Sequence, residues 1–350
     1  MTISPTFTLE TRATLAGLDF AALAGTMRQQ AQVYELEILE DSAQRILVEV
    51  RDFGRLQAEA CAEGCEVRLR AALPDRLQML QDSFVEQLRA LQPQAAETLR
   101  WQGGEAAGAV PPNVHFTTVQ SVTLLGRSFL RVTIKGDDLS GFQDDAIHFR
   151  LLLPPSDCET PEWPRLGENG ATIWPKGEMV LHRPVYTTRK ICHQSGEMAF
   201  DIFVHEGGRA TEWANRARPG DRLAIAGPGG GGIPDARKIL LYGDETALPA
   251  IARILDSLPA DASGAAVLLA DGGADCGYPL TPPAGITLRW LDRRQGDALT
   301  ELALAAWPEH RDHFLWFAAE KSQTQPVRKA VKDAQADPAT HYIAAYWSKP

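Results

Sequence analysis

The sequence predicts a multidomain protein with an N-terminal α+β domain, a strand-rich antiparallel barrel or sandwich, and a C-terminal α/β domain with a doubly wound parallel sheet. Three observations support this fold class. Residues 1–103 combine alternating strands with one amphipathic helix, residues 113–235 contain short strands separated by Gly, Pro and Asp, and residues 236–350 alternate between strands and helices. A length of 350 residues is also ordinary for a chain of several domains.

Residues 1–103 are expected to form the small α+β domain. Alternation of polar and apolar residues predicts half-buried strands at 33–39 and 65–71, and residues 45–51 and 55–60 between them are further strand candidates. Pro74 then opens an amphipathic helix, whose apolar stripe is Leu77, Leu80, Phe84, Leu88 and Leu91. Cys61 and Cys65 have no second Cys or His pair nearby, so Cys65 is interpreted as a small core residue rather than a metal ligand. This domain offers no catalytic constellation.

Residues 104–112 are predicted to be a linker, because they are small, flexible and end in two prolines. In the second domain, residues 113–235, alternation predicts strands at 130–135, 198–205 and 222–226. One helix is expected at 211–217, directly after Gly207 and Gly208. Its N-terminal amides would be free to meet an anion.

The stretch 182–189 concentrates polar chemistry in the second domain. It holds two arginines, an aromatic hydroxyl and two threonines, and follows a short strand expected at 178–181. Along an extended chain, Arg183, Val185 and Thr187 would face one way and Tyr186 the other. A flat cofactor with a phosphate tail needs a guanidinium group, a ring to pack on and a hydroxyl. The alternative is a half-exposed strand with ordinary polar residues, and the stretch alone does not separate these interpretations.

Residues 236–350 carry the α/β pattern. Strands are predicted at 238–242, 265–270, 286–291, 314–318 and 341–347, and helices at 246–258, 297–306 and 326–335. Ligands of such sheets bind at the carboxyl ends of the strands. These ends are predicted at 243–246, 271–273, 319–321 and 347–349. Asp244 or Thr246 is a candidate cap for the first helix.

The glycine-rich run at 227–232 formally contains G-x-G-x-x-G. A dinucleotide fingerprint should follow a strand of the parallel sheet and open a helix. This run instead ends the strand-rich domain and precedes another strand, so we interpret it as a flexible inter-domain loop.

Bulk composition excludes several classes of protein. A net charge of −10 with a pI of about 5.4 argues against a general nucleic-acid binder. The sequence contains no apolar run of membrane-spanning length and no secretory signal. Five cysteines, an odd number, fit a reducing cytoplasm, which is the expected location. No metal-binding spacing and no G-x-S-x-G motif occurs, so we expect neither a metal site nor a hydrolase.

Several motifs occur together in a defined order. They are Arg183-Pro-Val-Tyr186-Thr187-Thr-Arg189, Asp201-Ile-Phe-Val-His205-Glu-Gly-Gly208-Arg-Ala210-Thr-Glu-Trp213-Ala214, Gly220-Asp221, Gly227-Pro228, Tyr242-Gly243-Asp244-Glu245-Thr246-Ala247-Leu248-Pro249-Ala250-Ile251, Trp316-Phe-Ala-Ala-Glu320 and Tyr346-Trp347. With them, residues 113–350 resemble the siderophore-interacting proteins, which are flavin-dependent ferric-siderophore reductases related to the ferredoxin-reductase superfamily. The resemblance implies an antiparallel FAD-binding β-barrel at 113–235 and an NAD(P)H-binding α/β domain at 236–350. The first hundred residues lie outside it, and their role stays open.

The resemblance also implies roles for individual residues. Arg183 would hold the FAD pyrophosphate, Tyr186 would pack on the flavin ring, and Thr187 would hydrogen-bond near its reactive nitrogen, so Tyr186 and Thr187 are the catalytic candidates. His205 would lie against the flavin. The amides from Gly208 through Ala210 to Thr211 would face the pyrophosphate, with Trp213 in the same motif. The nicotinamide nucleotide would be lined by Asp244, Glu245, Thr246, Ala247 and Glu320.

The family also implies basic residues that attract an anionic ferric chelate, and the candidates are Arg189, Lys321 and Lys349. The sequence departs from the family at three places. Glu206 follows the histidine and Ala319 precedes Glu320 where glycine is usual, and Ser348 follows Trp347 where arginine is common. The first two leave the flavin site intact. The third leaves Lys349 as the candidate replacement for the usual arginine.

The hypothesis is an enzyme that passes a hydride from NAD(P)H to FAD and single electrons from the flavin to ferric iron in a siderophore, so that ferrous iron is released. One alternative is a flavin reductase of the same superfamily for another acceptor. Another is a siderophore-binding or iron-delivery module with weak redox activity. The family favours NADPH, whereas Asp271 at a strand end could repel its 2′-phosphate and favour NADH. The identity of the siderophore and the oligomeric state stay open.

Overall fold

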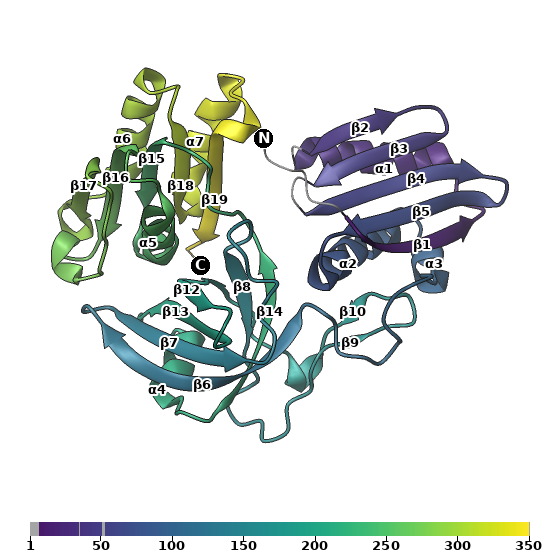
Figure 1. Cartoon of the computed structure of the whole chain (residues 1–350), viewed down its shortest axis with the longest axis horizontal. Coiled ribbons are helices and arrows are strands. Elements are labelled where there is room, and N and C mark those ends of the chain that lie inside the picture. The colour runs from purple at the N-terminus through teal and green to yellow at the C-terminus, as the bar shows by residue number, and fades with distance from the viewer. Residues whose placement is uncertain (1–6, 35, 51–52, 350) are drawn as a thin grey trace. The chain divides into compact units, whose positions relative to one another are not determined.

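The computed structural model describes residues 7–34, 36–50 and 53–349 (Figure 1). Contacts divide the chain into two compact units. The first comprises Met1–His115, Pro154–His182 and Ala226–Pro228, and the second comprises Phe116–Leu153, Arg183–Ile225 and Gly229–Pro350. The segment Pro154–His182, which the sequence assigned to the second domain, therefore packs with the N-terminal residues. Among the described residues, no helix is long and apolar enough to cross a membrane.

The first unit is built on a five-stranded antiparallel sheet in the order β1-β5-β4-β3-β2. The strands are β1 (Leu9–Ala16), β2 (Glu37–Asp41), β3 (Arg45–Val50), β4 (Gly54–Cys61) and β5 (Gly64–Ala71). The helices are α1 (Phe20–Val33), α2 (Pro74–Leu91) and α3 (Pro93–Thr98). Alternate residues of the strands and the apolar stripes of the helices share one core. The predicted stripe on α2 is confirmed, since Leu80, Phe84 and Leu88 are buried in it. Cys65 is buried there too, as expected.

The predicted strand at 33–39 is wrong at its start. Asp19 caps α1 by accepting a hydrogen bond from the Ala22 amide, and the helix continues to Val33. Its buried residues Phe20, Leu23, Ala24, Met27 and Ala31 recur at helical spacing, a signal that the sequence interpretation missed together with β1. The alternation of apolar residues that suggested a strand begins inside the last turn of this helix. Glu35 and Arg51, which fall within predicted strands, lie outside the described residues.

The first unit also includes the segment Pro154–His182, which lies between β8 and β11 in the sequence. It contains the two-residue strands β9 (Arg165–Leu166) and β10 (Thr172–Ile173) and the 3₁₀ turn η1 (Gly177–Met179). The strand predicted at 178–181 is therefore wrong. Gly177 has a φ of +60°, which turns the chain instead of extending it.

In the second unit, a seven-stranded sheet has the order β11-β8-β14-β6-β7-β13-β12. Its elements are β6 (Val114–Leu125), β7 (Phe129–Gly136), β8 (His148–Leu152), β11 (Val185–Thr187), β12 (Lys190–Cys192), β13 (Glu197–Phe203), α4 (Arg209–Arg216) and β14 (Arg222–Gly229). The chain pairs with β8 up to Thr188, whose amide donates to Ile147 O at 2.8 Å. It then pairs with β13 from Arg189, whose amide donates to Ala199 O at 2.8 Å. This change of partner closes the antiparallel sheet into the predicted barrel.

The C-terminal part contains a parallel five-stranded sheet in the order β17-β16-β15-β18-β19, as predicted. Its elements are β15 (Lys238–Gly243), η2 (Glu245–Ala247), α5 (Leu248–Ser257), β16 (Ser263–Ala270), η3 (Gly273–Cys276), β17 (Gly285–Asp292), η4 (Arg293–Gln295), α6 (Leu299–Ala306), η5 (Trp307–Glu309), β18 (Phe314–Glu320), α7 (Lys321–Asp333), η6 (Pro338–Thr340) and β19 (His341–Trp347). Helix α5 covers one face, while α6 and α7 cover the other (Figure 1). Helix α7 begins five residues before the predicted start at Pro326, because Glu320 caps it by accepting from the Ser322 amide.

Candidate functional site

The stretch that closes the barrel is also the one that the sequence singled out. Val185 is exposed, but Thr187, Thr188 and Arg189 are all buried. Simple alternation of faces therefore holds only as far as Tyr186. It fails beyond that point because the chain leaves β8 for β13, so that both of its faces become covered. One backbone segment thus presents an arginine to solvent and two hydroxyls to the interior.

Two guanidinium groups lie on the exposed side of this segment. Arg150 on β8 is the cross-strand partner of Val185, and its Nη1 donates to Arg183 O at 3.1 Å. Burial lowers the pKa of Arg183, and the charge of Arg150 lowers it further. Two positive charges that repel each other at one place are stabilised by an anion between them. Sequence reasoning found Arg183 and missed Arg150.

The side chain of Tyr186 packs against the core of the barrel. Its ring lies 5.7 Å from that of Phe200, with the planes tilted by 51°. Burial raises the pKa of Tyr186, so it remains a neutral phenol at physiological pH.

Thr187 belongs to a short hydrogen-bonded chain. Its Oγ1 lies 3.3 Å from Nδ1 of His148, directly opposite on β8. The other ring nitrogen of His148, Nε2, lies 3.0 Å from the hydroxyl of Tyr346 on β19. His148 thus joins the barrel to the parallel sheet and also contacts Thr187, which was predicted to approach the flavin. No local pattern marks His148, and the partners His148 and Tyr346 lie 198 residues apart.

Helix α4 offers main-chain donors. It begins after Gly208, and no side chain caps it, so its first N–H groups stay available for an anion. A Cβ at Gly208 would come within 2.8 Å of the exposed His205 ring, so a larger residue would require that ring to move. His205 is exposed, and its amide donates to Thr211 Oγ1 at 3.4 Å. Ala210 and Thr211 are buried in the first turn, and Trp213 packs partly into the barrel core.

At the carboxyl edge of the parallel sheet, Asp244 is fully buried between three donors. It accepts from the amide of Thr246 at 3.0 Å, from Thr246 Oγ1 at 2.6 Å and from Nε1 of Trp347 at 2.7 Å. Burial raises the pKa of Asp244 despite these donors. Asp244 thus caps the 3₁₀ turn η2 that leads into α5, whereas α5 itself begins after Ala247 without a side-chain cap. Ala247 is buried. These side chains shape the edge, so a nucleotide would meet the main chain here rather than the Asp244 carboxylate.

Glu245 is buried as well. It forms an ion pair with Arg293 and accepts from the amide of Asp271 at 2.9 Å. The side chain of Asp271 is 65% exposed and lies 3.9 Å from Arg293 Nε. The Asp271 carboxylate is therefore available to a ligand at this edge, whereas that of Glu245 is not.

Glu320 connects the two candidate lysines. Its carboxylate caps α7, which begins with Lys321, and accepts from the amide of Lys349 at 3.2 Å. The hydrogen bond from Ser322 is the main cause of the lowered pKa of Glu320. Both lysine side chains are exposed. The structure thus brings Lys321 and Lys349 together at one edge.

Arg189 is placed differently from the prediction. It is 6% exposed, and its Nη1 pairs with Asp256 of α5 at 2.7 Å. A guanidinium buried in this way holds α5 to the barrel and presents little surface to a chelate. We therefore leave Arg189 out of the proposed substrate site.

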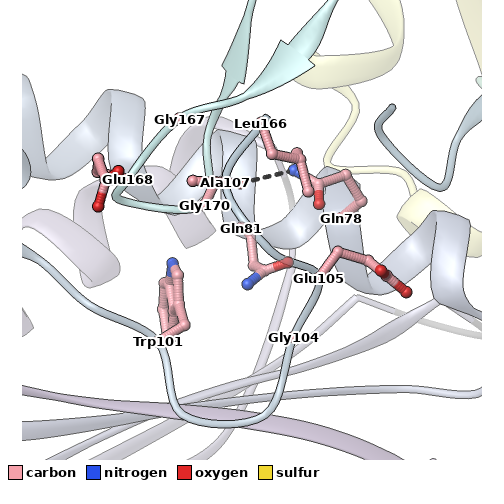
Figure 2. A pocket seen from close by; sticks show the side chains of 10 residues that line it. All are labelled: Gln78, Gln81, Trp101, Gly104, Glu105, Ala107, Leu166, Gly167, Glu168 and Gly170. Atoms are coloured by element: carbon pink, nitrogen blue, oxygen red, sulfur yellow. Dashed lines mark hydrogen bonds between the residues drawn. The ribbon is translucent and has the colours of Figure 1, made fainter. Parts of the chain in front are cut away.

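A separate pocket lies wholly within the first unit (Figure 2). Its volume is about 340 Å³ including the open mouth, and Gln81, Trp101 and Glu168 are among its lining residues. Gln78 closes one side by donating to Gly170 O at 2.9 Å, as the dashed line in Figure 2 shows. The indole N–H of Trp101 has no hydrogen-bond partner within the described part of the chain. This pocket was not anticipated from the sequence.

Comparison with known proteins decides how these features are interpreted. Residues 118–232 match the siderophore-interacting FAD-binding domain, and residues 236–350 match the siderophore-interacting protein domain. The NADPH-dependent ferric-chelate reductase of Escherichia coli is 30% identical over 239 residues, which are 66% of this chain and 91% of that protein. The chain belongs to the siderophore-interacting protein family. Both domain matches lie C-terminal to residue 117, so the five-stranded N-terminal sheet is outside them.

Further relatives agree with this family. The ferric vibriobactin reductase ViuB of Vibrio cholerae is 34% identical over 189 residues, or 52% of this chain and 67% of that protein. Among solved structures, a siderophore utilization protein from T. fusca has a TM-score of 0.59 at 28% identity, covering 70% of this chain and 96% of that one. The siderophore-interacting protein SipS from Aeromonas hydrophila has a TM-score of 0.57 at 27% identity, covering 68% and 99%.

The residues present fit FAD. The repulsion between Arg150 and Arg183 and the uncapped start of α4 both suit a pyrophosphate. The barrel of this family member is thus equipped for the flavin named in the family description.

Proposed function

We propose that this protein is an NADPH-dependent, FAD-containing reductase that acts on ferric iron held by a siderophore or a similar anionic chelate. The observation that carries the proposal is the direct joining of the two halves at the predicted flavin segment. In the barrel, Thr187 is linked through His148 to Tyr346 of the α/β part. The main-chain oxygen of Thr188 accepts a hydrogen bond from Arg253, and Arg189 forms an ion pair with Asp256. Electron transfer needs a nucleotide domain held firmly against the flavin domain.

Within this proposal, the chain supplies binding and orientation. Arg150, Arg183 and the start of α4 bind the pyrophosphate, Tyr186 packs beside the flavin ring, and Thr187 provides a hydroxyl at its reactive nitrogen. When bound, FAD couples a two-electron donor to one-electron acceptors. His205 lies against the flavin in this proposed FAD site.

The α/β part supplies the nucleotide site at the carboxyl edge of its sheet. The main chain around Thr246 and the capped turn before α5 would face NADPH, with Glu320 fixing the neighbouring edge. The name of the Escherichia coli relative supports NADPH over NADH.

The substrate is proposed to be an anionic ferric chelate. Lys321 and Lys349 are exposed at one edge, although the whole chain carries a net charge of −10. Reduction weakens the hold of hard oxygen donors on iron, so the metal is released without protein ligands. The five cysteines are all free, which fits a reducing cytoplasm as the place of this reaction.

The test is spectroscopic. Purified protein should be yellow, and anaerobic NADPH should bleach it. Mixing the reduced protein with a ferric siderophore should restore the colour and form ferrous iron, which a ferrous-specific chelator would report. Reoxidation no faster than in a chelate-free control would overturn the substrate. Faster reoxidation by quinones or free flavin than by any ferric chelate would identify the alternative flavin reductase.

A further inference from the structure

Thr187, His148 and Tyr346 form a hydrogen-bonded series of side chains that flavin binding alone does not require. Thr187 Oγ1 and the Tyr346 hydroxyl approach the two ring nitrogens of His148, at 3.3 Å and 3.0 Å. The ring is 5% exposed and meets the Tyr346 ring edge-on, at a centroid distance of 5.4 Å. A buried imidazole between two hydroxyls can accept a proton at one nitrogen while it releases one from the other.

His148 is neutral in this position. Burial is the main cause that lowers its pKa to about 4, and the charge of Arg253 adds to the effect, against a small opposing contribution from the backbone of Tyr186. A neutral imidazole carries one N–H, so one nitrogen donates and the other accepts. When Thr187 Oγ1 receives a proton from a donor outside this series, its own proton moves to Nδ1, the Nε2 proton moves to the Tyr346 oxygen, and Tyr346 releases its hydroxyl proton to solvent. All three groups then stay neutral, and both hydrogen bonds reverse together.

The glycine-rich run covers this series closely. A Cβ on Gly230 would come within 2.6 Å of Cδ2 of His148, and a Cβ on Gly231 would overlap with the Tyr342 ring. Tyr342 in turn contacts the hydroxyl of Tyr346. The run that resembled a flexible loop therefore provides a backbone lid over His148 and Tyr342. The main chain of this run packs directly on the His148 and Tyr342 rings, and Tyr346 is partly exposed.

The proposed reaction needs a route for one proton. Each hydride taken from the nicotinamide carries two electrons and one proton. Two ferric ions take two electrons and no proton, so two ferrous ions and one free proton result in every cycle. With FAD bound, this proton would leave from the flavin ring nitrogen, near which the family resemblance places Thr187.

We propose that His148 is the proton relay of this site, taking the released proton through Thr187 and passing it to Tyr346 as the electrons leave. This inference rests on the proposed function. It requires only a flavin and a one-electron acceptor, and does not depend on which chelate the protein uses. His148 contacts Thr187 rather than the reacting atoms, so it is a positioning and relay residue.

The experiment follows proton release directly. Protein with bound FAD is reduced anaerobically and mixed with ferricyanide in weak buffer containing a pH-indicator dye. In the natural protein, one proton should appear per two electrons, in step with the return of flavin colour. In Tyr346→Phe and His148→Ala, proton release and reoxidation should slow at least tenfold, and their slowing in D₂O should increase. Added imidazole should restore the His148→Ala rate, because it fits the space left by the ring.

The controls separate a relay from a packing effect. Tyr242→Phe removes another buried hydroxyl from the same unit and should leave both rates unchanged. In flavin-free protein, the ¹⁵N chemical shifts of His148 should show a neutral ring at pH 7 whose N–H position changes in Thr187→Val. Unchanged proton release in both relay variants, with no response to imidazole, would overturn the relay alone. Protein without flavin would overturn the proposed function as well. Oxidation by ferricyanide but not by ferric siderophores would overturn only the substrate assignment.

Discussion

Arg253 Nη1 donates a hydrogen bond to the main-chain oxygen of Thr188 at 2.5 Å. Its Nη2 pairs with Asp144 at 2.7 Å. Arg253 lies on α5 beside the parallel sheet, whereas Thr188 lies where the barrel closes. The buried guanidinium group of Arg253 thus connects the segment 182–189 to the nucleotide-binding half.

The first prediction concerns this contact. Arg253→Met should lower the stability of the second unit by about 1–3 kcal/mol, because it leaves the Thr188 carbonyl without its donor. Loss of the ion pair adds little, since the side chain of Asp144 is 74% exposed. Denaturant unfolding followed by near-ultraviolet circular dichroism would measure the loss. Arg328→Met is the matched control. Arg328 also donates to a backbone oxygen, Ile343 O at 2.8 Å, but it is exposed, so the change should cost less than about 1 kcal/mol. Equal losses in both variants would contradict the role of Arg253.

The second prediction concerns pH. The pKa of His148 is about 4 in the folded protein and near 6.5 without burial. The unfolded chain therefore binds more protons between these values, and stability should rise with pH across that window. The contribution of His148 is fully present above pH 6.5 and is lost as the pH falls towards 4. It amounts to about 3 kcal/mol at about 1.4 kcal/mol per pKa unit.

Urea unfolding at pH 7 and pH 4.5 would test this. His148→Phe should reduce the pH dependence of the free energy of unfolding, whereas His193→Phe, at an exposed histidine, should not. An unchanged dependence in His148→Phe would contradict the assignment.

The contact between His148 and Tyr346 also shows where sequence reasoning reaches its limit. Local periodicity identified β5, α2 and the five parallel strands, because each buries one face of a regular element. It missed α1, whose stripe includes small residues such as Ala24 and Ala31, and it misread the turn at Gly177. The Arg183–Thr187 motif carried the candidate flavin site. Arg150, His148 and Arg253 carry no motif, because they act through partners that only the closed barrel brings near.

The third prediction concerns the backbone lid. Gly231→Ala places a methyl group against the Tyr342 ring, so it should destabilise the second unit by about 1–3 kcal/mol through overpacking. Gly25→Ala is the comparison, since Gly25 lies in α1 and a methyl group added there would meet nothing within 4 Å. It should stabilise the first unit by about 0.5–1 kcal/mol through helix propensity. Calorimetry would measure both changes. A Gly231→Ala protein as stable as the natural one would show that Tyr342 can move to accommodate the methyl group.

The fourth prediction concerns the nucleotide. Asp271 follows β16 at the carboxyl edge, and its side chain is 65% exposed. Asp271→Asn removes one negative charge from the region where a 2′-phosphate is expected, so the ratio of kcat/KM for NADPH to that for NADH should rise about fivefold, equivalent to about 1 kcal/mol. Asp261→Asn removes the same charge before β16, at the opposite edge, and should leave the ratio unchanged. Equal effects of the two changes would place the 2′-phosphate elsewhere.

The fifth prediction concerns the ferric chelate. Lys321→Glu and Lys349→Glu each replace an exposed positive charge at the edge that Glu320 organises. Each should lower kcat/KM for an anionic ferric siderophore about threefold to tenfold at low salt, with a smaller loss at high salt, because exposed charges are screened. Lys332→Glu changes the net charge equally but lies in the last turn of α7, away from this edge, and should have little effect. The rate of flavin reduction by NADPH should stay constant in all three variants. Stopped-flow reoxidation at two salt concentrations would measure the difference, and an equal loss in Lys332→Glu would mean that overall charge, not this pair of lysines, attracts the substrate.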